Sequence, residues 1–364
     1  MKHYQFIIAS IVSLCAANLQ AADYFQPFFL DNPELVDFQY LPQEQQSFIQ
    51  YYLDAQTKIS EGADASDFFT ITHAPNTDEQ EPLLGDIRFG QDEPFNNLCP
   101  HINGKRAVTG CVATAMASVM TYYQYPNCGT GTVTYSGGAN GAKTINLEDY
   151  PFDWNNILHQ YTYSSYNEQQ ADAVATLMLA CGAALNMQYS ADGSGIFTEK
   201  VPGVMKNNFH FDPSIAFYSS KNYPYPEELF EYDWGPTIRE QTKGGKPVIF
   251  AGHPAQGQSG HCFVIDGYKT IDGIYYYHVD WGWTGYLNGY FLLTNLNPDG
   301  TSYSGYACTM VIDIFPLNWT SIGNINADNQ SNQTIYNILG QPVTPEARIK
   351  GNIYIQNGQK YLYQ

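Results

Sequence analysis

The chain has 364 residues, a formal net charge of −19 and only 14% charged residues. This acidic balance argues against a nucleic-acid-binding protein, because such binding depends on Lys and Arg side chains that neutralise phosphates. After the first 22 residues, no stretch approaches the roughly 18 consecutive apolar residues that a membrane span needs. The length suits one large domain with additional segments, or two domains.

Residues 1–22 have the layout of a cleavable secretory signal peptide. Lys2 precedes an apolar run over residues 6–17, and the small residues Ala21 and Ala22 offer a cleavage site. The apolar run is too short for a spanning helix. We therefore expect a secreted protein that acts outside the cell or at its surface.

Residues 23–84 are interpreted as a pro-segment. Residues 41–60 predict an amphipathic helix, and the polar run "THAPNTDEQEP" follows at 72–82. Polar runs of this kind are typical of linkers that proteases can reach. Processing is therefore expected within residues 74–86.

Residues 85–318 read as one compact unit in which helices come first and strands follow. Such an order is typical of an α+β fold with an antiparallel sheet packed on helices. Helices are expected at 111–123, 167–189, near 199–209 and at 226–242, and strands at 246–253, 261–268, 274–281, 289–296 and 308–315. Residues 319–364 differ in composition and predict a linker followed by a small β-rich module.

The cysteines indicate neither a metal centre nor a dense disulfide scaffold. Cys15 lies in the signal peptide; a lipoprotein is the alternative there, but Leu14 stands where a lipid-attachment signal carries a small residue. The others are scattered without any CxxC pair, so no metal or cofactor is implied. If one of them is reserved for chemistry, an odd number remains and at least one more is unpaired. They are Cys99, Cys111, Cys128, Cys181, Cys262 and Cys308.

Cys111 lies at the start of the first predicted helix of this unit. Thr109 is a reasonable N-cap, Gly110 permits an unusual backbone angle, and Ala, Met and Val cover every face of the run that follows. A helix that is apolar all round is buried, so its amino end would point Cys111 into a cleft. The helix dipole and free N–H groups favour a thiolate there, although a small buried packing residue is an equal alternative from this segment alone.

A thiol nucleophile needs a base, and His261 is the best-placed histidine. It stands at the first residue of the apolar strand "HCFVIDGY", where a side chain can emerge into a cleft, although such a position is also typical of a capping residue. The next strand, "IYYYHVDW", would form a hairpin with it and bring Asp280 beside the imidazole as a third member. His278 and His253 are the rival partners for the cysteine.

Four ordered segments resemble the streptopain family of papain-like cysteine peptidases: "GQDEPFN", "TGCVATAMASVMTYYQYP", "GHCFVIDGY" and "YYHVDWGWTGYLNGYFLLTNLNP". They run in order across about residues 85–317. The resemblance implies a papain-like α+β fold, in which a helical half packs against an antiparallel sheet half with a cleft between them. It also implies synthesis as a zymogen whose own pro-segment is an intramolecular inhibitor.

The resemblance implies that Cys111 is the nucleophile and His261 the proton acceptor. Gly260 and Ser194 are similar to positions that contact the substrate backbone, and a pair of tryptophans near the histidine matches the family. These tryptophans are Trp281 and Trp283, and ordinary core packing is the alternative role for them.

The sequence departs from the family pattern at two places. Asp280 stands where streptopain has Asn before the first tryptophan, and a carboxylate there would hold His261 protonated more strongly. Lys105 stands six residues before the nucleophile, where papain-like enzymes often carry the Gln of the oxyanion hole. Gln91 is the alternative donor, together with the backbone N–H of Cys111.

The resulting hypothesis is an endopeptidase that acts on protein or peptide substrates through a Cys111 acyl-enzyme. One alternative is a non-catalytic adhesin or inhibitor on the same fold. Another is an acyl transferase, for example a transglutaminase, that uses the same Cys–His pair with an amine in place of water. The tail at 319–364 resembles modules that serve sorting or surface attachment.

Overall fold

The structure is a computed structural model. The described residues are 19–21, 28–31, 58, 69–71, 78–137, 141–162, 165–220, 234–254, 259–271, 273–304, 307–317, 319, 335–337, 342–343, 353–356 and 359–362. Apart from Lys58, the helix expected at 41–60 lies outside these residues, as do 226–233 of the last expected helix.

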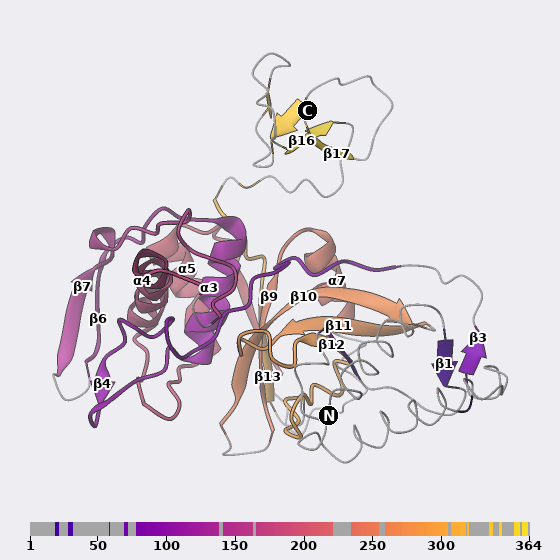
Figure 1. Ribbon diagram of the computed structural model, residues 1–364, viewed down its shortest axis with the longest axis horizontal. Helices are drawn as coiled ribbons and strands as arrows, with labels where there is room; N and C mark the ends of the chain where they lie inside the picture. Colours follow the sequence, from indigo (N-terminus) through magenta and orange to yellow (C-terminus); the bar gives the residue numbers. More distant parts are fainter. Residues whose placement is uncertain are drawn as a thin grey trace.

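Helices form one lobe and a sheet forms the other (Figure 1). The helices of the first lobe are α3 (Cys111–Tyr123), α4 (Glu168–Leu185) and α5 (Val201–Phe209), with 3-10 turns η5 (Leu147–Asp149) and η6 (Thr198–Lys200). A fourth helix, α7 (Gly235–Lys243), packs on β9 and β10 of the sheet lobe. Two short hairpins, β4 (His101–Ile102) with β5 (Lys105–Arg106) and β6 (Thr132–Ser136) with β7 (Ala142–Asn146), lie at the edge of the helical lobe.

The second lobe is a seven-stranded antiparallel sheet in the order β2-β12-β11-β10-β9-β13-β8. Its strands are β2 (Phe28–Leu30), β8 (Ala216–Ser219), β9 (Val248–His253), β10 (His261–Ile271), β11 (Ile274–Asp280), β12 (Gly289–Phe291) and β13 (Ala307–Ile312). Helices before strands and an antiparallel sheet confirm the predicted α+β class. The expected hairpin is also confirmed, since Val264 of β10 is opposite Asp280 of β11.

Local sequence explains where the two long helices of the first lobe begin and end. Asn167 caps α4 through a capping box with Gln170, in which each side chain accepts a backbone N–H of the other residue at 2.9 Å. α3 stops at Gln124, which adopts the left-handed conformation, two residues before Pro126. The helix expected at 167–189 therefore ends earlier, at Leu185.

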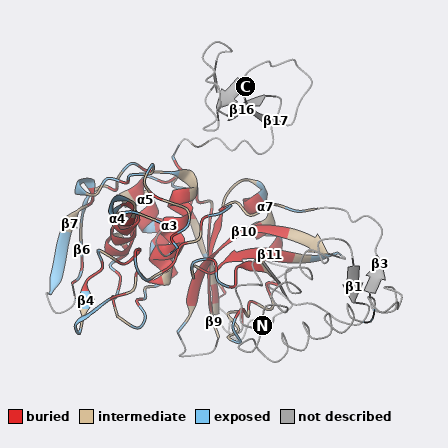
Figure 2. Ribbon diagram, in the orientation of Figure 1, coloured by how far each residue is buried: buried red, intermediate tan, exposed pale blue. Residues whose placement is uncertain are grey.

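The hydrophobic core lies on both faces of the sheet (Figure 2). One cluster joins the sheet to α3 and α4, and the second lies under α7 with Trp281 and Phe263. Met116 and Met120 of α3 are fully buried, as a helix that is apolar on every face requires. Because α3 packs between α4 and β10, the first residue of α3 is fixed relative to the first residue of β10.

The segment before residue 85 already pairs with the sheet. Gln80 exchanges backbone hydrogen bonds with Tyr268, and the N–H of Leu83 donates to the carbonyl of Asp266 at 3.0 Å. The carboxylate of Asp78 accepts hydrogen bonds from Tyr268 and Tyr275. Residues at the end of the expected pro-segment are thus hydrogen-bonded to β10 and β11.

Two further small sheets lie outside these lobes. β1 (Leu19–Ala21) pairs with β3 (Phe69–Ile71), and a four-stranded sheet has the order β15-β14-β16-β17. The strands of the latter are β14 (Ile335–Asn337), β15 (Pro342–Val343), β16 (Ile353–Gln356) and β17 (Gln359–Leu362), within the region where short strands were expected. Among the described residues, no helix is long and apolar enough to cross a membrane.

Candidate active site

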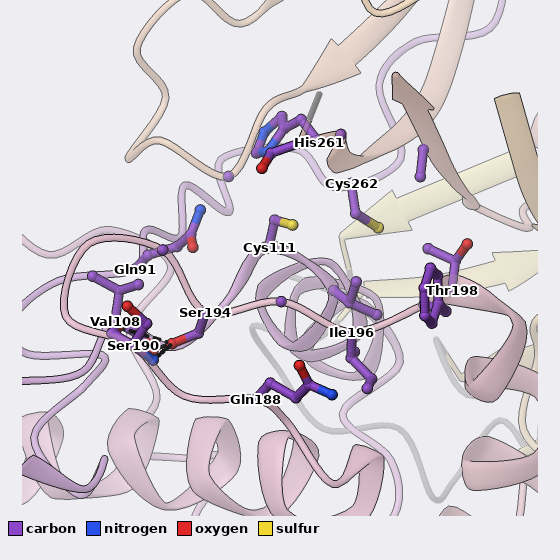
Figure 3. A pocket seen from close by; sticks show the side chains of 18 of the residues that line it. Gln91, Val108, Cys111, Gln188, Ser190, Ser194, Ile196, Thr198, His261 and Cys262 are labelled. Atoms are coloured by element: carbon purple, nitrogen blue, oxygen red, sulfur yellow. Dashed lines mark hydrogen bonds between the residues drawn. The ribbon is translucent and has the colours of Figure 1, made fainter. Parts of the chain in front are cut away.

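A cleft of about 1300 Å³ opens where the amino end of α3 meets the first residue of β10 (Figure 3). One wall comes from the loop at 188–199, and the other comes from Trp283 and its neighbours. Cys111 and His261, the predicted nucleophile and base, both line this cleft, although 150 positions of chain separate their numbers. The fold therefore brings together the two side chains that the sequence selected.

Gly110, rather than Thr109, is the N-cap residue of α3. Its φ is 90°, and no side chain caps the helix. The hydroxyl of Thr109 instead pairs with that of Thr114 at 2.9 Å, so the predicted Thr109 cap is wrong. A Cβ at Gly110 would lie 2.8 Å from the sulfur of Met187 and 3.0 Å from the carbonyl of Ser194, so only glycine fits.

The sulfur of Cys111 faces backbone donors, and the residue is half-buried where it lines the cleft. Burial raises the pKa of the Cys111 thiol, while the N–H groups of Cys262, Val112 and Cys111 itself oppose this shift. The same N–H groups are available to an oxyanion that forms beside the sulfur.

His261 is held by a carbonyl and by stacked rings. Its Nε2 lies 2.7 Å from the carbonyl oxygen of Trp281, and because a carbonyl only accepts, Nε2 carries the proton. The Trp283 ring stacks on the imidazole with centroids 4.8 Å apart, and Trp281 lies behind it at 6.2 Å. Burial lowers the pKa of His261 to about 4, so the ring is neutral and its Nδ1 is basic.

Asp280 is not the hydrogen-bond partner of His261. Its Oδ1 accepts from the N–H of Gly282 at 2.9 Å, and its Oδ2 makes no hydrogen bond within the described residues. Burial raises the pKa of Asp280 to about 6. The expected carboxylate–imidazole contact is thus replaced by the main-chain carbonyl of the next residue, because the strand ends by turning the Trp281 peptide toward the ring.

Asn288 is a site residue that the sequence analysis missed. Its buried Oδ1 accepts from the N–H of Trp281 at 3.0 Å, and so holds the main chain of the residue whose carbonyl, in the next peptide unit, contacts His261. It lies after the Trp283 turn and before β12. Neither hydrophobic period nor spacing marks it, because its role depends on how the turn folds back.

Ser194 and Gly260 both line the cleft. The hydroxyl of Ser194 donates to the carbonyl of Val108 at 2.7 Å and accepts from the N–H of Ser190 at 2.9 Å, which ties the loop to the segment before Cys111. A Cβ at Gly260 would lie 2.7 Å from the carbonyl of Gly252. Ser194 thus uses its side chain to hold the wall, which leaves its main chain for other contacts.

The two candidate oxyanion donors are separated by the fold. Gln91 lines the cleft on the side of Cys111 (Figure 3). Lys105 is exposed on β5 and does not line the cleft. Of the two positions, only Gln91 is placed to donate from a side chain.

The rival histidines have different surroundings. His278 is fully buried on β11 and donates to Asp266 at 2.6 Å and to Asp31 at 2.9 Å, so it does not face the cleft. His253 lines the cleft at the end of β9, beside Gly260. His261 is therefore the histidine that both faces the cleft and is oriented by the Trp281 carbonyl.

All six cysteines from Cys99 onward are free thiols. The expectation that at least one besides the candidate nucleophile is unpaired is therefore met. Cys262, buried directly beside His261, is one of them.

Comparison with known proteins identifies the family. Residues 89–291 match the Peptidase C10 family, a span that contains Cys111, His261 and every other residue that lines the cleft except Thr309. The chain belongs to this family. It is 30% identical to streptopain of Streptococcus pyogenes over 286 residues, in an alignment that covers 72% of this chain and 67% of streptopain.

Other peptidases of this kind show the same relationship. A thiol protease/hemagglutinin, PrtT of Porphyromonas gingivalis, is 32% identical over 67% of this chain and 28% of its own length. The structure of active interpain A of Prevotella intermedia superposes with a TM-score of 0.56 at 32% identity, covering 64% of this chain and 94% of interpain A. A prointerpain A fragment gives 0.53 at 30% identity, with 74% and 84% covered. The chain is thus a cysteine-type peptidase with a papain-like fold.

Proposed function

We propose that this C10 peptidase is a secreted endopeptidase, made as a zymogen, that hydrolyses peptide bonds through an acyl-enzyme on Cys111. The observation that carries the proposal is that Cys111 and His261 line the same cleft. Cys111 lies at the amino end of a buried helix, and His261 is held by the Trp281 carbonyl. Its substrates are proteins or peptides, in line with the thiol protease to which the chain is similar.

In the first chemical step, the Cys111 thiol gives its proton to Nδ1 of His261 and the sulfur attacks the peptide carbonyl. The developing oxyanion is stabilised by the backbone N–H of Cys111 and, as we propose, by the side chain of Gln91. The imidazolium then protonates the departing amine, which leaves a thioester.

The second step uses the same imidazole in the reverse sense. Neutral His261 takes a proton from water, the resulting hydroxide attacks the thioester carbonyl, and the sulfur leaves with the proton that the imidazolium returns. Trp281 and Trp283 exclude water from the face of the ring, so His261 exchanges protons with reactants rather than with solvent. Asp280 supports this arrangement by holding the Gly282 N–H, and Gly260 and the Ser194 main chain border the substrate backbone.

The remaining segments are assigned roles in export and activation. Residues 1–22 direct secretion, and residues 23–84 contain the pro-segment that inhibits the enzyme until it is removed, in line with the similarity to prointerpain A. Residues 319–364 form a linker and a small β-rich module for sorting or surface attachment.

The proposal is tested by replacing the nucleophile. Cys111→Ala should abolish casein hydrolysis and self-processing, whereas Cys128→Ala, at another half-buried free thiol, should leave both unchanged. N-terminal sequencing of the two products reads the processing position at the same time. Continued maturation and hydrolysis by the Cys111→Ala protein would contradict the assignment.

Two further measurements separate the alternatives. A thiol-directed epoxide inhibitor should label Cys111 stoichiometrically in the matured protein, and an adhesin or inhibitor without catalysis would show no such preference. Mass analysis of products formed with an added amine should show hydrolysed rather than cross-linked peptides; a majority of cross-linked products would favour acyl transfer.

A further inference from the structure

The strand β2 lies far from the rest of the peptidase unit in the chain but forms the edge of its sheet. It pairs antiparallel with β12, with Leu30 opposite Gly289 and Phe28 opposite Phe291. The pairing continues at Asp31, whose N–H donates to the carbonyl of Asn288 at 2.9 Å. Residues 28–31 therefore supply main-chain partners to a sheet edge that would otherwise be open.

The carboxylate of Asp31 is inserted into a cationic site of the peptidase unit. Its Oδ2 accepts from Nε2 of His278 at 2.9 Å and lies 3.5 Å from Nη2 of Arg88. His278 is fully buried, and its Nδ1 donates to Asp266 at 2.6 Å. Nη1 of Arg88 is held by the carbonyls of Gly85 and Ile87.

The site is incomplete without a carboxylate. Both ring nitrogens of His278 donate, and Asp266 satisfies only one of them. A buried charged donor that loses its partner costs far more than an exposed one. Of the described residues, Asp31 is the one that satisfies Nε2 of His278 and also reaches Arg88.

We propose that the β12 edge, with His278 and Arg88 at its end, is a docking surface for the pro-segment, and that Asp31 is its anchoring residue. The partner that fits is an extended strand followed directly by a carboxylate, read by strand addition and by charge. This inference rests on the proposed function only in treating residues 23–84 as a separable pro-segment.

The docking surface is connected to the active site through Asn288. Its carbonyl accepts from Asp31, its Oδ1 accepts from the N–H of Trp281, and the carbonyl of Trp281 holds His261. Docking of the strand therefore stabilises the same turn that orients the catalytic imidazole. The docked strand can therefore affect the orientation of His261, although residues 28–31 do not line the cleft.

The anchoring role is tested by hydrogen exchange on the full-length Cys111→Ala chain, which cannot process itself. Asp31→Asn in this background should increase exchange of the amides at 28–31 and 289–291 by about tenfold or more, because a hydrogen bond between charged groups is replaced by a neutral one. Amides of α3 and α4 should be unchanged, which shows that the chain is folded. Unchanged exchange at 289–291 would overturn the proposal.

Two variants sharpen this test. Arg88→Gln should increase exchange at the same amides, and the double variant with Asp31→Asn should add little to the larger single effect, because both act on one contact. Asp172→Asn, at an exposed carboxylate of α4, is the matched control and should change nothing. Additive effects of Asp31→Asn and Arg88→Gln would show that the two residues do not share a site.

A processing assay uses the active full-length chain. Asp31→Asn should shorten the half-time of self-processing several-fold, while the matured enzymes should have equal activity because Asp31 has been removed from both. An equal or longer half-time would count against an anchoring role. If neither chain processes, the proposed function fails, but the exchange measurement still decides whether the strand is anchored.

Discussion

His261 is kept neutral by burial and not by an anionic partner. The Trp281 carbonyl fixes the tautomer and the stacked Trp283 ring removes water from one face, and burial lowers the pKa of the imidazole to about 4. The pH dependence of kcat/KM should therefore change when water gains access to this ring.

Trp283→Ala should shift the acid limb of kcat/KM to higher pH by about one unit. Water would reach the ring, the charged form would be less penalised, and the pKa of His261 would rise toward its ordinary value, so the base would be protonated, and lost, at higher pH. A pH–activity profile measures this shift. Trp154→Ala, at a half-buried tryptophan of the helical lobe that is hydrogen-bonded to Pro126, is the control; an unmoved limb in Trp283→Ala would refute the explanation.

Asn288 is expected to be a positioning residue. Asn288→Ala removes the acceptor that holds the Trp281 peptide, so kcat should fall by about tenfold with little change in KM, in keeping with one lost hydrogen bond. Asn288→Asp keeps an acceptor oxygen and should recover most of the loss, which a purely structural role would not predict. Steady-state kinetics at several pH values test this, with Asn156→Ala as a control. A proportional loss of folded protein in place of kcat would contradict the role.

At the scale of the element, the first turn of α3 is the most constrained part of the site. Gly110 has φ 90° and no room for a Cβ, and the chain passes directly from it into Cys111. The nucleophile is thus placed by a backbone turn between the 188–199 loop and the helix. The position of the sulfur depends on that turn as much as on the helix.

Gly110→Ala should therefore destabilise the Cys111→Ala chain by about 2–4 kcal/mol, because it combines an unfavourable φ with a clash against Met187 and the Ser194 carbonyl. Urea denaturation measures the change in the free energy of unfolding. Gly104→Ala is the matched control, since φ is 80° there but nothing lies within 4 Å, so it should cost only about 1–2 kcal/mol. Equal costs at the two glycines would show that packing at Gly110 is unimportant.

At the scale of the whole molecule, an acidic protein holds a buried cation at the centre of its sheet. Burial alone would lower the pKa of His278, but Asp266 and Asp31 outweigh it and raise the pKa to about 10. His278 contacts both carboxylates, and Arg88 and Lys269 are further cationic groups that act on Asp31. This cluster joins β10, β11 and the residue after β2, so it contributes to the stability of the whole sheet.

A raised histidine pKa stabilises the fold fully below the unfolded value of about 6.5 and loses that contribution as pH rises to about 10. The free energy of unfolding of the Cys111→Ala chain should accordingly fall over this range. His278→Asn should cost about 3–5 kcal/mol at pH 6 and show a much smaller slope with pH. His159→Asn, at an exposed pair with Asp86, should cost less than about 1 kcal/mol. If the free energy of unfolding changed with pH equally in His278→Asn and in the unsubstituted chain, this explanation would be contradicted.

The sequence by itself determined the class of fold and selected the two candidate reacting side chains. The order of helices and strands, the apolar run behind Cys111 and the strand that begins at His261 are local patterns, so they are readable without coordinates. The hairpin that joins β10 to β11 was predicted for the same reason, because a turn signal lies between two alternating runs.

Only the tertiary structure decided what orients His261 and what covers the sheet edge. The contacts of the Trp281 carbonyl, Asn288 and Asp31 depend on backbone groups and on residues far apart in the chain. The expected Asp280 contact was wrong for this reason: sequence spacing gives the face of a strand on which a side chain lies, but not the direction in which the next peptide turns. Directed hydrogen bonds of the main chain carry no residue-type signal, so they become visible only when the chain is folded.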